Sequence, residues 1–208
     1  LKERFTVPSI VLSVSRLVLQ SFVANYNYKN GFEEGLLRLK NMAAELGEEG
    51  EKLVKNFESK KYSMEGAALP DVMLEDVDGK MHKLTDFRGK YLYIDLWASW
   101  CGPCCQEVPY LQKLEKQLNN PMVEFISISL DKREKDWRKM LEEEKLPWVM
   151  LWNEEGFVIG NEPNKIQRAY GFYSIPFIVL IDKDGRLLAK DLRGERVKEE
   201  ILKARANK

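Results

Sequence analysis

The three cysteines of the chain lie within five residues, in the segment WCGPCC that ends at Cys105. Cys101 and Cys104 form a C-x-x-C pair, and Cys101 and Cys105 form a second, C-x3-C spacing. Thiols at such spacings could form a redox-active disulfide, bind a metal ion or act as a peroxidase nucleophile. A structural disulfide framework would scatter an even number of cysteines along a short chain, so the crowding favours reactivity.

The residues around the pair indicate how it is positioned. The apolar run YLYIDLWA, 91–98, predicts a central strand buried on both faces, and a helix is expected to begin near Cys101. Pro103 suits the first turn of a helix, where its missing N–H is not needed. At a helix N-terminus the free N–H groups and the helix dipole lower the pKa of a thiol. Cys104, one turn further along and expected to be more buried, could resolve mixed disulfides formed by Cys101.

A helical extension is predicted before this region. Residues 9–62 indicate two or three helices, and the composition changes at EGAALPD, 65–71, which indicates a linker. We therefore expect an extension over 1–66 and a main domain over 67–208. The apolar residues expected to line the helical core recur at spacings of three and four: Val11, Val14, Val18 and Phe22 in the first helix, and Leu36, Leu39, Met42, Ala43 and Leu46 in the second.

The main domain alternates strands and helices. Asp78-Gly79 and Asp184-Gly185 are strong hairpin signals between short apolar runs. The order β-α-β-α followed by β-β-α predicts an α/β fold with a mixed sheet. The predicted elements are a hairpin over 72–84, the strand 91–98, a helix to about 119, the strand 122–130, a surface helix over 132–145, a hairpin over 175–192 and a closing helix over 195–208.

The overall composition excludes several classes of function. The 33 Lys and Arg residues balance 33 Asp and Glu residues, so no nucleic-acid partner is expected. A single histidine, His82, argues against a His-rich metal centre, and we expect no cofactor and no metal. The run 7–24 is interrupted by Arg16 and Gln20, which predicts a soluble chain. Because the sequence starts at Leu1, we expect a processed form from which a targeting signal or membrane tether was removed.

The segment IDLWASWCGPC, 94–104, resembles the signature of the thioredoxin superfamily. The wider frame resembles the TlpA/ResA branch: LPDVMLEDVDGKMHKLTDFRGK precedes the site, Cys-x-x-Glu-x-Pro follows the second cysteine, and SIPFIVLIDKDGRLL lies downstream. This resemblance, over about 68–206, implies a thioredoxin-like fold and a thiol–disulfide oxidoreductase of the cell envelope or periplasm. The Gly-Pro between the cysteines implies a reducing poise. Disulfide-bearing protein substrates and a membrane electron donor are the partners it implies.

The resemblance also implies residues that bind the substrate. Trp100 corresponds to the aromatic residue before the first cysteine and would shield one side of the sulfur. Pro176 corresponds to the cis-proline that faces the active disulfide. A cis bond there would leave the Ile175 backbone free to bind an extended substrate peptide.

Two acids correspond to proton-handling residues in relatives. Asp95 stands at the position of the buried acid of thioredoxin, where burial would raise its pKa and let it exchange a proton with Cys104. Glu107 matches the acid that follows the cysteines in the TlpA/ResA branch. Many members of that branch lack an acid in the strand, so the sequence leaves open which of the two serves Cys104. Pro109, inside the helix, matches the family's helix proline and predicts a kink.

Two other functions stay as alternatives. Thiol peroxidases of the related group place the nucleophile in a Pro-x-x-x-Thr-x-x-Cys context, and no threonine lies three residues before Cys101. Copper-carrying proteins on this fold use a C-x3-C spacing with a later histidine, whereas His82 precedes the cysteines. Cys105 would lie about 100° around the helix from Cys104, so we expect a thiol without a catalytic role.

Overall fold

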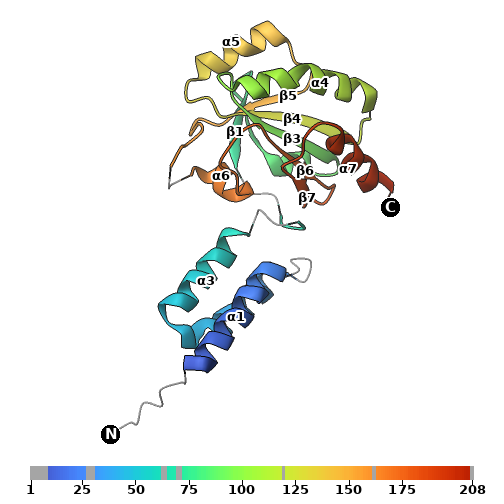
Figure 1. Cartoon of the computed structure of the whole chain (residues 1–208). Helices are drawn as coiled ribbons and strands as arrows, with labels where there is room; N and C mark the ends of the chain where they lie inside the picture. Colours follow the sequence, from blue (N-terminus) through green and yellow to red (C-terminus); the bar gives the residue numbers. More distant parts are fainter. Residues whose placement is uncertain are drawn as a thin grey trace. The chain divides into compact units, whose positions relative to one another are not determined.

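The computed structural model describes residues 9–26, 31–61, 65–68, 72–118, 120–160 and 163–206. Parts of the predicted linker (69–71), of the break between the first two helices (27–30) and of the closing helix (207–208), and the side chain of Val11, lie outside the described residues. The contacts between residues divide the chain into two compact units, Leu1–Ala67 and Ala68–Lys208 (Figure 1).

The described residues of the first unit form the α-helices α1 (Ser9–Asn25), α2 (Phe32–Ala43) and α3 (Glu48–Ser59), with the short 3-10 helix η2 (Ala44–Leu46) after α2. The prediction of a helical extension is therefore confirmed. Apolar and aromatic side chains fill the space between the helices, and the most buried of them are Leu19, Val23, Leu39, Ala43 and Phe57. None of the helices in the described ranges is long and apolar enough to cross a membrane.

The predicted apolar repeat of α1 is buried only in part: Phe22 packs against the helical core. Val14 and Val18 are 55% and 52% exposed, and the helix buries Leu19 and Val23 instead. Met42 of α2, also expected inside, is 45% exposed. Because α1 carries apolar residues on several sides, spacings of three and four fit more than one stripe, and packing against α2 and α3 decides which stripe is buried.

The second unit is built on one mixed sheet in the order β2-β1-β5-β4-β3-β6-β7. Strands β3, β4 and β5 are parallel, and the other neighbours are antiparallel. This confirms the predicted α/β class and both predicted hairpins. The strands are β1 (Met73–Asp76), β2 (Met81–Lys83), β3 (Tyr91–Trp97), β4 (Val123–Ser129), β5 (Val149–Trp152), β6 (Phe177–Ile181) and β7 (Leu187–Lys190).

Helices cover both faces of the sheet. They are the 3-10 helix η3 (Leu84–Phe87) and the α-helices α4 (Gly102–Leu118), α5 (Glu134–Glu144), α6 (Lys165–Tyr170) and α7 (Glu195–Ala206). Figure 1 shows α4 and α5 together on one side and α6 on the other. Strand β3 explains this division, because its side chains alternate and all are buried. Leu92 and Ile94 pack in the core that includes α6, whereas Tyr91 and Tyr93 pack with α4 and α7.

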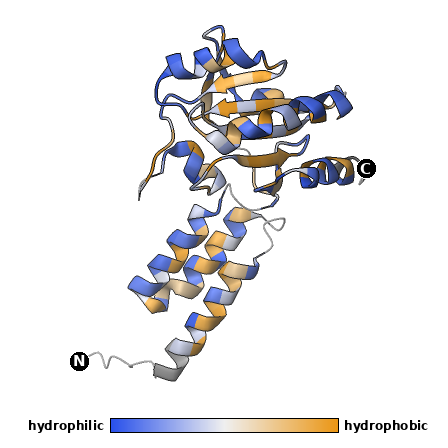
Figure 2. Ribbon diagram, turned by 45° about the horizontal axis from the view of Figure 1, so that its top comes forward, coloured by the Kyte–Doolittle hydropathy of each residue, from blue (hydrophilic) through white to orange (hydrophobic). Residues whose placement is uncertain are grey.

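Two elements of this unit were not predicted. Strand β5 has only four residues, too few to show an alternating pattern, although it completes the parallel part of the sheet. Helix α6 has six residues and depends on its ends: the Asn164 side chain accepts a hydrogen bond from Gln167 N at 2.8 Å, and Gly171 ends the helix with φ 68°. In Figure 2 the central strands are hydrophobic, whereas the helices carry both hydrophobic and hydrophilic residues.

Candidate active site

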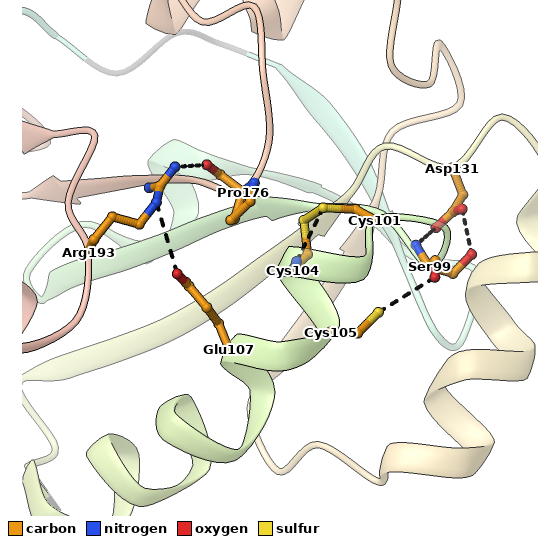
Figure 3. Close-up of a disulfide and its surroundings, with 8 residues drawn as sticks. All are labelled: Ser99, Cys101, Cys104, Cys105, Glu107, Asp131, Pro176 and Arg193. Atoms are coloured by element: carbon orange, nitrogen blue, oxygen red, sulfur yellow. Dashed lines mark hydrogen bonds and ion pairs between the residues drawn. A yellow bond between two sulfur atoms is a disulfide. The ribbon is translucent and has the colours of Figure 1, made fainter.

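A disulfide joins Cys101 and Cys104 at the start of α4, with an S–S distance of 1.98 Å (Figure 3). Strand β3 ends at Trp97 and α4 begins at Gly102, so only four residues separate them and the pair lies just beyond the carboxyl end of the strand. Both cysteines are almost fully buried, with exposed fractions of 5% and 4%. The expected difference in burial between them is therefore not present in this disulfide form.

Cys101 occupies the cap position of α4, as the Pro103 pattern predicts. Its Sγ accepts a hydrogen bond from Cys104 N at 3.2 Å, and its carbonyl accepts the first helical bond from Cys105 N at 3.1 Å. A sulfur that receives a backbone N–H at the positive end of a helix is in the environment that favours a thiolate over a thiol. The helix continues through Pro109, which has no N–H to offer the preceding turn.

The peptide bond between Ile175 and Pro176 is cis, and Pro176 is buried beside the disulfide (Figure 3). The Ile175 side chain packs against the cluster that contains both disulfide cysteines. Within the described part of the chain, the backbone of Ile175 makes no hydrogen bond. The N–H and carbonyl groups of Ile175 could therefore form hydrogen bonds with an extended peptide next to the disulfide.

Trp100 directly precedes Cys101 and is 58% exposed. Its ring meets that of Phe157 edge-on, with centroids 6.0 Å apart. These two rings and the exposed Ile159 are among the residues that line a groove of about 520 Å³. Trp100 and Ile159 thus leave exposed apolar surface in a groove next to the disulfide.

Asp95 and Glu107 approach each other from β3 and α4. Asp95 pairs with Ser127 of β4 and Ile178 of β6, so it lies inside the sheet. Desolvation, and then the charge of Glu107, raise the pKa of Asp95 to about 7, while Arg193 and a hydrogen bond with Ser127 oppose the shift. Desolvation also raises the pKa of the partly buried Glu107, against the charge of Arg193. One acid is thus sealed in the sheet, and the other lies between it and the surface.

Cys105 points away from the disulfide, as the helical geometry predicts (Figure 3). Its thiol donates to the carbonyl of Ser99 at 3.6 Å, and desolvation raises its pKa. Ser99 is also held by the buried carboxylate of Asp131, which accepts from Ser99 N at 2.9 Å and from Ser99 Oγ at 2.7 Å. The role of Asp131 was missed, although it follows an apolar strand as an isolated acid, the same signal that drew attention to Asp95.

Arg193 was missed as well. It follows β7, donates a hydrogen bond to the carbonyl of Pro176 and lies 3.9 Å from Oε1 of Glu107 (Figure 3). An arginine in the charged stretch DLRGERVKEE carries no local signal of such contacts.

Comparison with known proteins decides the family. The model of the Redoxin family matches residues 64–205. The chain belongs to the Redoxin family. It is 30% identical to the thiol–disulfide oxidoreductase ResA of Bacillus cereus over 156 residues, which cover 74% of this chain and 85% of that protein. ResA of Geobacillus thermodenitrificans is also 30% identical, over 70% of this chain and 79% of that protein.

Solved structures of the same kind share the fold. The thioredoxin domain of a thiol–disulfide oxidoreductase from Bacteroides vulgatus is 29% identical with a TM-score of 0.59, over 67% of this chain and 96% of that one. A thiol:disulfide interchange protein from a Bacteroides species is 29% identical with a TM-score of 0.57, over 68% and 90%. This redoxin therefore has a thioredoxin-like fold and is a ResA-like thiol–disulfide oxidoreductase, which acts on disulfide-bearing proteins.

The geometry of the redoxin weakens the copper alternative. His82 lies in β2, four strand positions from β3 in the sheet, or about 19 Å at the usual strand spacing. Its Nε2 is 2.5 Å from the Asp76 carboxylate within the same hairpin. The described residues hold no group of three or more potential metal ligands. His82 therefore cannot complete a site with Cys101 and Cys105.

Proposed function

We propose that this chain reduces protein disulfides in the cell envelope, with Cys101 as the nucleophile and Cys104 as the resolving cysteine. The observation that supports this most directly is the Cys101–Cys104 disulfide at the start of α4, beside the cis bond of Pro176. The Gly-Pro between the cysteines, by its resemblance to thioredoxin, favours the reducing direction. The envelope setting is what the resemblance of the sequence to the TlpA/ResA branch implies.

The reaction balances as two exchanges. In the dithiol form the Cys101 thiolate attacks one sulfur of the substrate disulfide, and the other substrate sulfur leaves as a thiolate. Cys104 then loses its proton and attacks Cys101, which closes the Cys101–Cys104 bond and releases the second substrate thiolate. The substrate gains two electrons, and its thiolates take up two protons. A membrane electron donor of the dithiol class would return the protein to its reduced form.

Three residues would hold the substrate for this exchange. The free backbone of Ile175, fixed by the cis bond to Pro176, would pair with an extended peptide beside the reacting sulfurs. Trp100 and the groove next to it would receive apolar side chains of the same peptide. Recognition through backbone groups and an apolar surface fits an enzyme that accepts many sequences.

The two acids would divide the proton transfer between them. With a pKa of about 7, Asp95 can take the proton from Cys104 as the resolving step begins. Glu107 lies one helical turn after Cys104, and its charge acts on Asp95. Because Glu107 is only partly buried, it would pass that proton to solvent. Thus Asp95 would serve Cys104 directly, and Glu107 would connect Asp95 to the surface.

The helical unit would be separate from the redox unit. We expect residues 67–208 to carry the exchange chemistry without residues 1–66, because every proposed site residue lies after the boundary between the two units. The helices would instead serve docking or association.

Trapping of substrates tests the assignment of the two cysteines. We expect Cys101→Ser to abolish insulin reduction, because no thiolate can attack the substrate. Cys104→Ser should accumulate mixed disulfides, because the first exchange proceeds and the second cannot. Cys105→Ser is the matched control and should retain the activity of the wild type. Insulin turbidity and non-reducing mass spectrometry measure these results, and an active Cys101→Ser variant would refute the proposal.

A further inference from the structure

Arg193 joins parts of the site that lie far apart in the sequence. Its guanidinium donates one hydrogen bond to the carbonyl of Pro176 and another to that of Leu192 at 2.7 Å. Its Nε lies 3.9 Å from Oε1 of Glu107, and its Nη2 lies 3.5 Å from the carboxylate of Asp191. Figure 3 shows Arg193 beside Pro176, on the side of that residue away from the disulfide, with Glu107 directed toward it from α4.

We propose that Arg193 is a positioning residue of thiol–disulfide exchange: its guanidinium fixes the carbonyl of Pro176 and holds a positive charge beside Glu107. One side chain would then set both the loop that receives the substrate and the acid that handles the proton. The inference rests on the proposed roles of Ile175, Asp95 and Glu107.

The contact with Pro176 concerns substrate binding. A hydrogen bond from a charged donor to the Pro176 carbonyl restrains the loop immediately after Ile175, whose backbone would pair with the substrate. The planar guanidinium has five donors, so it can hold two carbonyl groups and still face a carboxylate. The three donors of a lysine share one nitrogen and cannot span these partners. Loss of the contact should therefore weaken substrate binding.

The charge of Arg193 concerns proton transfer. Arg193 lowers the pKa of both Asp95 and Glu107, against the desolvation that raises both. The hydroxyls of Tyr93 and Tyr110 are buried without a hydrogen-bond partner among the described residues, so they give the acids no hydrogen bonds. The titratable and charged groups that face this cluster are Asp95 and Tyr93 from β3, Glu107 and Tyr110 from α4, and Asp191, Arg193 and Glu195 from the segment after β7.

The direction of the pH effect follows from these charges. Asp95 must be ionised to accept the proton of Cys104, so the rate of the resolving step rises with pH through the pKa of Asp95. Desolvation and the charge of Glu107 raise the pKa of Asp95, whereas Arg193 lowers it. Removal of the positive charge of Arg193 should therefore raise the pKa of Asp95 further. The rising limb of the pH–rate profile should therefore move to higher pH.

Two substitutions separate the contact from the charge. The full chain, returned to its dithiol form by an added dithiol reductant, would be mixed with a disulfide-bonded peptide from pH 5 to 9, and kcat, KM and the pH of the rising limb measured. Arg193→Lys keeps the positive charge, so we expect the rising limb to stay at the same pH. It loses the charge-assisted hydrogen bond to the Pro176 carbonyl, so we expect KM to rise about tenfold. Arg193→Gln loses both, so we expect the raised KM together with a limb moved upward by at least about half a pH unit.

Arg138 supplies a matched control. Its side chain is 41% exposed, compared with 40% for Arg193. It also pairs with a carboxylate, Glu134 at 2.5 Å, and donates to a backbone carbonyl, that of Val77 at 2.8 Å. Because these contacts lie on α5 and the first hairpin, Arg138→Gln should leave both the KM and the pH profile unchanged.

The outcomes distinguish this inference from the proposed function. Asp95→Asn and Glu107→Gln should each alter the pH profile of the same assay. Suppose that both acid variants alter the pH profile. The inference about Arg193 is then wrong if Arg193→Gln keeps the rising limb and the KM of the wild type. It is also wrong if Arg193→Gln lowers kcat equally at every pH. If neither acid variant alters the profile, the proposed proton transfer fails as well. The inference is supported if the rising limb of the pH profile moves in Arg193→Gln. It also requires that Arg193→Gln, added to Asp95→Asn, moves the limb no further than Asp95→Asn alone.

Discussion

Two buried carboxylates near the site, Asp131 beside Ser99 and Asp95 in β3, have different hydrogen bonds, and Figure 3 draws the first of them. Asp131 accepts three side-chain or backbone hydrogen bonds, from Ser99 N, Ser99 Oγ and Ser129 Oγ at 2.7–2.9 Å. Asp95 has a hydrogen bond with Ser127, and its pKa rises to about 7. Asp95 lies within β3 and Asp131 follows the end of β4, and both are almost fully buried. The two carboxylates are thus similarly buried, but Asp131 accepts more hydrogen bonds than Asp95 and ties the loop at Ser99 to the end of β4.

The largest effect expected from this comparison is the loss of Asp131. In Asp131→Ala the Ser99 N–H and the two serine hydroxyls lose a charged acceptor inside the protein. We expect the free energy of unfolding of the oxidised protein to fall by about 4 kcal/mol, measured by urea denaturation. Because Asp131 does not face Asp95, the pH at which the activity rises should stay the same.

A surface acid gives the control for that measurement. Asp136 pairs with Arg133 at 2.6 Å on the exposed side of α5, and its alanine variant should lose less than about 1 kcal/mol. If Asp131→Ala is no more destabilised than Asp136→Ala, Asp131 does not hold the loop.

The second effect concerns the stability cost of Asp95. The folded protein holds a proton on Asp95 up to about pH 7, whereas the unfolded chain releases it near pH 3.8. Between these values the folded state binds more protons, so stability falls as the pH rises through this window, and the full cost is present above it. At 1.36 kcal/mol per pKa unit the cost is about 4 kcal/mol. Asp95→Asn should recover part of it, about 3 kcal/mol at pH 8, and nothing at pH 3.

This second prediction is checked by urea denaturation of the oxidised protein at both pH values. Equal stability of Asp95→Asn and the wild type at pH 8 would mean that Asp95 is ionised at no cost. The proposed contrast with Asp131 would then be lost.

The same comparison shows what could be predicted from the sequence. The disulfide, the cap position of Cys101 and the direction of Cys105 depend on residues within one turn of α4, and all three were predicted. The raised pKa of Asp95 followed from a strand expected to be buried on both faces. By contrast, Asp131 meets Ser99 across 32 residues and Arg193 meets Pro176 across 17, and no local pattern indicates such pairings.

The same limit explains the errors in the fold. The type of each N-terminal helix was correct because periodicity determines it, but the buried face of α1 was correct only in part, since Val14 and Leu19 are equally apolar choices. Strand β5 and helix α6 are short, and they form because β4 and the Asn164 cap stabilise them. Local patterns thus predict elements well, and they predict partners poorly.

The smallest effect is expected at Cys105, which lies beside Ser99. Its thiol is held by one weak hydrogen bond to Ser99, and its raised pKa keeps it protonated at neutral pH. We therefore expect Cys105→Ala to change the free energy of unfolding by about 1 kcal/mol or less and to leave insulin reduction unchanged. Alkylation of Cys105 by iodoacetamide in the oxidised protein should be slow at pH 7 and accelerate only above pH 9. Fast alkylation at pH 7 would show that the surroundings of Cys105 stabilise its thiolate, which contradicts the raised pKa.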